Sequence, residues 1–154
     1  MLKQLKAARI VALLIVAVMP FALIACGGDS KKDTYKKDAN KIANQVKSDS
    51  QAAQASFQAA ATSPDKLVTA FNDWKGKLDK SISDFEALNP PDDIKDAHDK
   101  FVTNLKALSE DLGTAATALK NQDQAALQQL QTKITTDSAA LQSSASDLDN
   151  KLNN

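Results

Sequence analysis

The sequence predicts an all-α protein, an antiparallel up-down-up-down four-helix bundle that follows a short N-terminal leader. Beyond residue 30, apolar residues recur at alternating spacings of three and four, as they do along one face of an α-helix. Within this body the prolines, Pro64, Pro90 and Pro91, stand only at the borders of the periodic segments, and the only glycines are Gly76 and Gly113. Short turns join four segments of similar length, so neighbouring helices are expected to run antiparallel.

Local signals mark where each expected helix begins and ends. Ser63 is typical of an N-cap, and Pro64 suits the first helical position because its missing N–H would have no helical partner there. Pro90 and Pro91 cannot continue a helical hydrogen-bond ladder. Asp123 is a suitable cap for the last helix. The expected helices span residues 34–61, 64–88, 92–120 and 124–152 of a bundle domain at 34–154.

The first 25 residues have the order of a secretory signal. Three basic residues precede an apolar stretch that Pro20 alone interrupts. The stretch has about 16 residues, fewer than the roughly 20 that a membrane-spanning helix needs, which favours cleavage over a retained anchor. We therefore expect residues 1–25 to be removed and residues 26–33 to form a polar tether to the bundle.

The signal ends in the run Leu23-Ile24-Ala25-Cys26, which resembles the lipobox that signal peptidase II cleaves in bacterial lipoproteins. The resemblance implies cleavage between Ala25 and Cys26, with diacylglycerol and an N-acyl chain on Cys26. It also implies an extracytoplasmic, lipid-anchored location, with the outer membrane possible in a Gram-negative cell. Lipidation would explain an exported protein's single cysteine, which can form no internal disulfide. The remainder of the chain resembles small all-helical envelope lipoproteins because its expected helices are rich in alanine. This second resemblance implies no site residue.

Composition disfavours nucleic acid as a partner and catalysis as an activity. Without the leader the chain has 16 lysines against 19 acidic residues, a net charge of −3. Its one arginine, Arg9, belongs to the leader, and arginine is the preferred residue for bidentate contacts to phosphate and guanine. No hydrolytic motif or glycine-rich phosphate loop is present. We expect a non-enzyme with no cofactor apart from the covalent lipid.

His98 is the first candidate site residue. It is the only histidine, it occupies the core stripe of the third helix, and Asp92, Asp93, Asp96 and Asp99 surround it in sequence. An imidazole among carboxylates can bind zinc or iron, or sense protons. The commoner arrangement is a boundary histidine whose ring is satisfied by a neighbour, either Tyr35 or a serine of the second or fourth helix.

Trp74, Asp49 and Asp137 are the other candidates, all at mid-bundle. The apolar stripes of the first and last helices are interrupted at Asp49-Ser50 and at Asp137-Ser138, near the level of Gly76. These polar residues either form a small layer with the aspartates turned to water or line a pocket beside Trp74.

These observations favour a non-enzymatic binding or structural module held at the membrane by lipid. It would dock an envelope protein, a wall polymer or a second copy through a helix face. The alternative is a lipoprotein that binds a small ligand or metal ion, in a mid-bundle pocket or at the His98 end.

Overall fold

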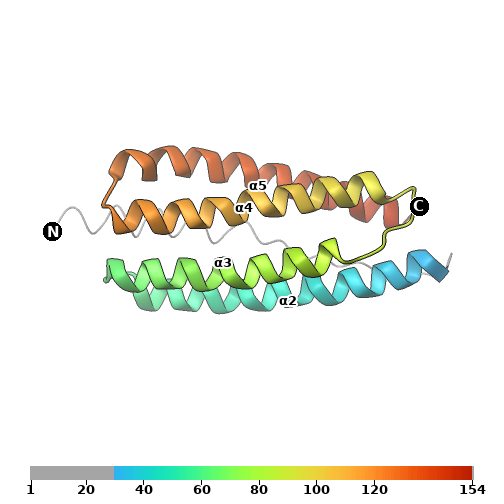
Figure 1. The fold of residues 1–154 in the computed structure, drawn as a ribbon, viewed down its shortest axis with the longest axis horizontal. Coiled ribbons are helices and arrows are strands. Elements are labelled where there is room, and N and C mark those ends of the chain that lie inside the picture. The colour runs from blue at the N-terminus through green and yellow to red at the C-terminus, as the bar shows by residue number, and fades with distance from the viewer. Residues whose placement is uncertain (1–29, 154) are drawn as a thin grey trace.

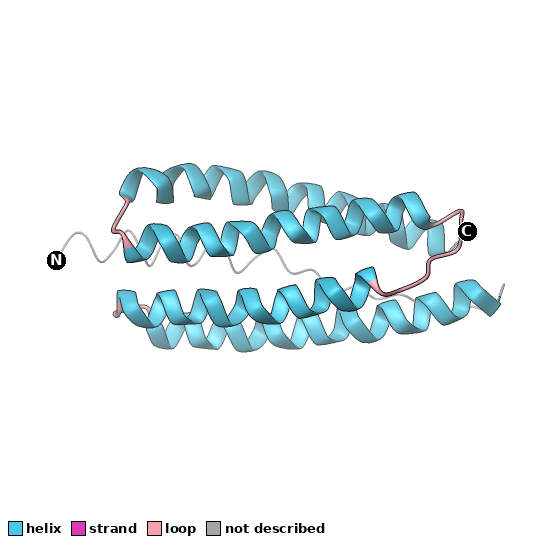
Figure 2. Ribbon diagram, in the orientation of Figure 1, coloured by secondary structure: helices cyan, strands magenta, loops and turns pink. Residues whose placement is uncertain are grey.

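The computed structural model describes residues 30–153 and confirms the antiparallel four-helix bundle (Figure 1). Consecutive helices pack against one another, α2 on α3, α3 on α4 and α4 on α5. The connections at 61–63 and 121–123 lie together at one end, while the 87–94 connection, the start of α2 and the end of α5 lie at the other (Figures 1 and 2). The helices are α2 (Ser30–Ala60), α3 (Pro64–Glu86), α4 (Lys95–Lys120) and α5 (Gln124–Asn153).

Two of the predicted helix starts are confirmed by their capping contacts. Ser63 has extended backbone and its side chain accepts a hydrogen bond from the N–H of Lys66, with Pro64 in the first turn of α3. Asp123 Oδ1 accepts from the N–H of Ala126, at 3.0 Å, at the start of α5. Just before it, Gln122 has a φ of 54°, the left-handed conformation that reverses the chain after α4.

The predicted tether, residues 26–33, extends too far into the chain. α2 begins at Ser30, so residues 30–33 of the predicted tether 26–33 are helical. Asp33 lies in the first turn, where a carboxylate interacts favourably with the free N–H groups of the helix. The polar composition of this segment therefore reflects an exposed first helical turn.

The predicted start of the third helix at residue 92 is also wrong, because α4 begins at Lys95. The N–H of Ile94 bonds to the carbonyl of Pro91 at 2.9 Å and closes a turn before the helix. Ile94 is completely buried, so packing of this one side chain fixes the turn. α3 correspondingly ends at Glu86, two residues before its predicted end.

The core is built from the apolar stripes that the sequence indicates, with aromatic side chains joining the helices. The Phe57 ring of α2 lies 4.6 Å from Phe71 and 5.8 Å from Trp74 of α3. Between α3 and α4, the rings of Phe85 and Phe101 meet edge to face at 5.2 Å. Each such pair contributes about 0.5–1.5 kcal/mol beyond the burial of its area. The aromatic side chains of α3 are thus part of the core.

Candidate functional sites

His98 is satisfied by Tyr35, one of the neighbours that the sequence suggested. The Tyr35 hydroxyl lies 2.8 Å from His98 Nδ1, and the two rings pack edge to face with centroids 5.7 Å apart. Only 3% of Tyr35 and 4% of His98 are exposed. The contact joins the second turn of α2 to the first turn of α4, at the end of the bundle where α5 also ends.

Burial sets the protonation states of this pair. Desolvation raises the pKa of Tyr35, helped by the charge of Asp99, so Tyr35 is a phenol with a hydrogen to donate. Nδ1 of a neutral His98 is the acceptor within reach, which assigns the ring proton to Nε2. Desolvation also lowers the pKa of His98, against an opposite effect of Asp99.

Two of the acidic residues around His98 in sequence, Asp99 and Asp93, engage lysines. Asp99 pairs with Lys95 at 2.6 Å, and Asp93 pairs with Lys32 of α2 at 3.1 Å. Across residues 30–153, no three His, Cys, Asp or Glu side chains form a group that could hold a metal ion.

Lys36 adds another contact at this end of the bundle. It is 95% buried, and its Nζ donates to Asn153 Oδ1 of α5 at 2.8 Å. Together with Lys32–Asp93 and Tyr35–His98, this contact ties the start of α2 to three separate parts of the bundle.

The three mid-bundle candidates, Trp74, Asp49 and Asp137, lie at the predicted level, and each contacts a different neighbour. Trp74 is buried against Phe57. Asp49 Oδ1 lies 3.5 Å from Lys77 Nζ, beside Gly76 on α3, so the gap in the α2 stripe faces α3. Asp137 pairs with Lys133 of its own helix at 2.5 Å. Both aspartates thus make ion pairs, and a ligand pocket beside Trp74 stays a prediction.

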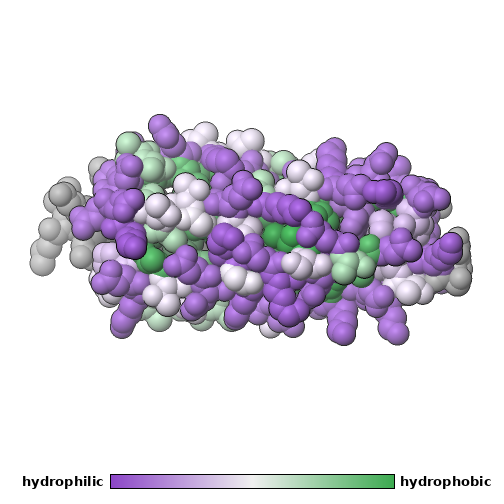
Figure 3. All heavy atoms as spheres, in the orientation of Figure 1, coloured by the Kyte–Doolittle hydropathy of each residue, from purple (hydrophilic) through white to green (hydrophobic). Residues whose placement is uncertain are grey.

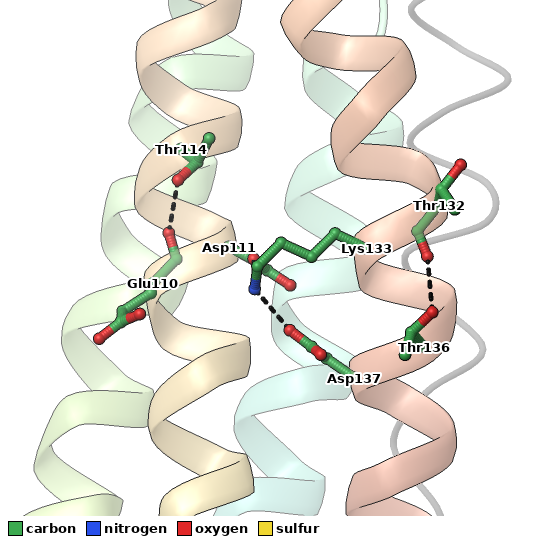
Figure 4. A network of polar contacts seen from close by, with 7 residues as sticks. All are labelled: Glu110, Asp111, Thr114, Thr132, Lys133, Thr136 and Asp137. Atoms are coloured by element: carbon green, nitrogen blue, oxygen red, sulfur yellow. Dashed lines mark hydrogen bonds and ion pairs between the residues drawn. The ribbon is translucent and has the colours of Figure 1, made fainter.

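The most buried charge of the described bundle, Asp111 on α4, was not among the residues that the sequence suggested. Its side chain is 2% exposed, and Oδ1 accepts from Lys133 Nζ of α5 at 2.6 Å, so one ammonium bridges Asp111 and Asp137 (Figure 4). Asp111 Oδ2 and the hydroxyl of Ser138 are buried without a hydrogen-bond partner. Burial raises the pKa of Asp111, and the hydrogen bond from Lys133 opposes this effect.

Asp111 shares its face of α4 with a second polar side chain, Asn104. Asn104 lies seven residues before it, and the Asn104 amide donates to the Ala140 carbonyl and the Ser144 hydroxyl of α5. Positions seven apart share a helix face. Asp111 therefore faces α5 as Asn104 does.

A second polar contact joins α3 to α4. The Ser109 hydroxyl donates to Asp79 Oδ1, and Lys75 Nζ lies 2.6 Å from Asp79 Oδ2. Partial burial would raise the pKa of Asp79, but the hydrogen bonds from Lys75 and Ser109 outweigh it and lower that pKa. Such contacts fix the register of neighbouring helices.

An open groove of about 560 Å³ lies near the turn between α4 and α5. The hydroxyls of Thr114 and Thr117 donate to main-chain carbonyls within α4, which leaves their oxygens as acceptors. Carboxylates of Glu110 and Asp123 add negative charge. The groove is lined by Glu110, Gly113, Thr114, Thr117, Ala118, Asn121, Asp123 and Ala126.

The lipidation motif, with Ala25 and Cys26, lies outside the described residues. Among the helices of residues 30–153, none combines the length and apolar character needed to cross a bilayer. Comparison with protein-family models, curated proteins and solved structures finds no match to this chain.

Proposed function

We propose that this chain is a cell-envelope lipoprotein, anchored through Cys26, whose helical bundle acts as a non-enzymatic binding or structural module. The observation that carries the proposal is the lipobox-like run at residues 23–26, placed immediately before the bundle.

The short link between the proposed anchor and the bundle gives the module a defined position. Only residues 27–29 separate Cys26 from Ser30, and a step of four residues reaches at most about 14 Å. On this proposal, the end with Tyr35 and His98 lies beside the membrane. α2 has 31 residues, a length of about 46 Å, so the turns at 61–63 and 121–123 would be presented far from the lipid.

Two features of the bundle support a structural or docking role. Its buried polar side chains join helices to one another, as Asp111 does with Lys133 and Lys36 with Asn153. The face drawn in Figure 3 is mainly hydrophilic, with apolar areas confined to separate patches. Such a surface favours a partner that binds largely through polar contacts.

Lipidation is tested by producing the full chain in a bacterium supplied with an alkyne-tagged fatty acid. We expect wild-type protein to carry the tag and sediment with membranes, and Cys26→Ser to do neither. The control is Gly28→Ala, which lies outside the four lipobox residues and should behave as wild type. Label on Cys26→Ser, or unlabelled wild-type protein, would contradict the proposal.

Docking is tested by photo-cross-linking in the same cells. A photoreactive amino acid at Gln122, in the distal turn, should give protein or wall-polymer adducts that depend on Cys26. The matched position is Asp93, at the opposite end, where we expect fewer adducts. Adducts from Gln122 that are equally abundant in Cys26→Ser would show that docking needs no anchor and would contradict the tethered module.

A further inference from the structure

The start of α2 is held to the bundle differently from the rest of that helix. Antiparallel pairing of Phe57 with Phe71, and of Asp49 with Lys77, places Glu86, the end of α3, opposite about residue 41 of α2. Residues 30–41 therefore extend beyond α3, and their described contacts reach the 87–94 connection, α4 and α5. Tyr35–His98 is the buried side-chain hydrogen bond among them.

We propose that the Tyr35–His98 contact is a pH-sensitive latch, which holds residues 30–41 on the bundle while His98 is neutral and releases them when it is protonated. The latch rests on contacts within the bundle. Only its position next to the membrane rests on the proposed lipidation of Cys26.

Hydrogen-bond chemistry explains why protonation opens the contact. Neutral His98 accepts the Tyr35 hydrogen at Nδ1, whereas imidazolium has a hydrogen on both nitrogens and accepts nothing. After protonation the Tyr35 hydroxyl has no acceptor at Nδ1, and a charge is enclosed in a site that is 96% buried. Release of the first turns of α2 would expose both side chains to water.

The charged groups around His98 do not remove this cost. On α4, Asp99 favours the protonated ring and Lys95 opposes it, and on α3 Glu86 favours it more weakly. Asp99 and Lys95 are ion-paired to each other. α2 contributes Tyr35, and the ammonium of the next residue, Lys36, is hydrogen-bonded to Asn153 of α5. Desolvation remains the largest effect, and it keeps the pKa of His98 below the ordinary histidine value.

The sign of the pH dependence follows from linkage. In the latched state His98 binds its proton more weakly than in the released state. The latch is therefore complete above the ordinary histidine pKa of about 6.5, and it weakens as the pH falls from there through the lowered pKa of the latched state.

The experiment is hydrogen exchange by mass spectrometry on the full chain in nonionic detergent, at pH 7.5 and pH 5 with intrinsic rates corrected. We expect protection of residues 30–41 to fall by about threefold or more, while peptides from α3 keep theirs; tenfold would correspond to one unit of pKa separation. His98→Asn places an amide oxygen near the position of Nδ1 and cannot titrate, so its protection should not change with pH. Lys36→Met loses a different contact and should retain the pH step.

An NMR titration of the His98 ring gives an independent readout, since the chain has one histidine. A lowered His98 pKa together with a pH step confined to residues 30–41 is the expected result. A pKa at or above the ordinary value, or equal pH steps in wild type and His98→Asn, would overturn the latch. Neither outcome depends on lipid, so failure here is distinguishable from failure of the lipoprotein proposal.

Discussion

Lys133→Met is expected to destabilise the bundle because it removes the cation that pairs with Asp111 of the neighbouring helix α4. The wild-type ammonium lies 2.6 Å from Asp111 Oδ1 and 2.5 Å from Asp137 Oδ2. Without it, the Asp111 carboxylate, whose side chain is 2% exposed, has lost its cation while Oδ2 already has no partner. Removal of one member of a buried ion pair typically costs about 3–5 kcal/mol.

Protonation limits this cost. Asp111 can take up a proton instead of remaining charged, and at pH 7 that costs about 4 kcal/mol relative to an unfolded carboxyl with a pKa near 3.9. Lys133 is half exposed, so solvent already weakens the original pair. We therefore expect Lys133→Met to lower the free energy of unfolding by about 2–4 kcal/mol at pH 7.

The stability lost in Lys133→Met should depend on pH. Burial raises the pKa of Asp111, and without the opposing hydrogen bond from Lys133 that pKa is higher still in the variant. The unfolded carboxyl is the same in both proteins, so the loss should shrink as the pH falls from the pKa of the variant to that of the wild type, and it should be smaller at pH 4 than at pH 7. Replacing Asp111 as well, in Lys133→Met/Asp111→Leu, should restore most of the stability at pH 7.

Urea unfolding followed by circular dichroism, at pH 7 and pH 4, measures both effects. The matched control is Lys80→Met, which removes an exposed pair with Asp84 on one helix and should cost about 0.5 kcal/mol or less. A Lys133→Met loss no larger than that of Lys80→Met, or the same loss at both pH values, would refute the reasoning.

The remaining predictions concern packing and helix propensity, and thermal and urea unfolding check them. Phe57→Ala should cost about 3–5 kcal/mol, because the ring is 99% buried between α2 and α3; a loss under about 1 kcal/mol would contradict this packing. Gly76→Ala should stabilise by about 0.8–1 kcal/mol, since its added Cβ meets nothing within 4 Å. Gly113→Ala should gain less, because its Cβ would come within 3.3 Å of Lys75 Cε; an equal or larger gain would count against that crowding.

The architecture could be predicted because its determinants are local. Apolar spacing, the Ser63 cap and the prolines after α3 each act within a few residues, and together they specify four antiparallel helices. Once the turns are placed, counting outward along the helices brings Tyr35 and His98 to the same end. Their contact was therefore predictable from sequence.

The features that sequence missed depend on residues far apart in the chain. Asp111 lies beside the apolar stripe of α4, a position where a charged residue is usually solvated, and its burial depends on Lys133 from the next helix. The start of α4 was misplaced because Asp92 and Asp93 are typical of a helix N-terminus. Burial of Ile94 instead closes a turn there.

The most direct test of the lipoprotein proposal is the mass of the mature N-terminus. Protein purified from membranes and digested with protease should yield no peptide from residues 1–25. Its N-terminal peptide should begin at Cys26 and carry the added mass of a diacylglycerol and an acyl chain. A chain that keeps Met1, or a mature N-terminus with an unmodified Cys26, would contradict the proposal.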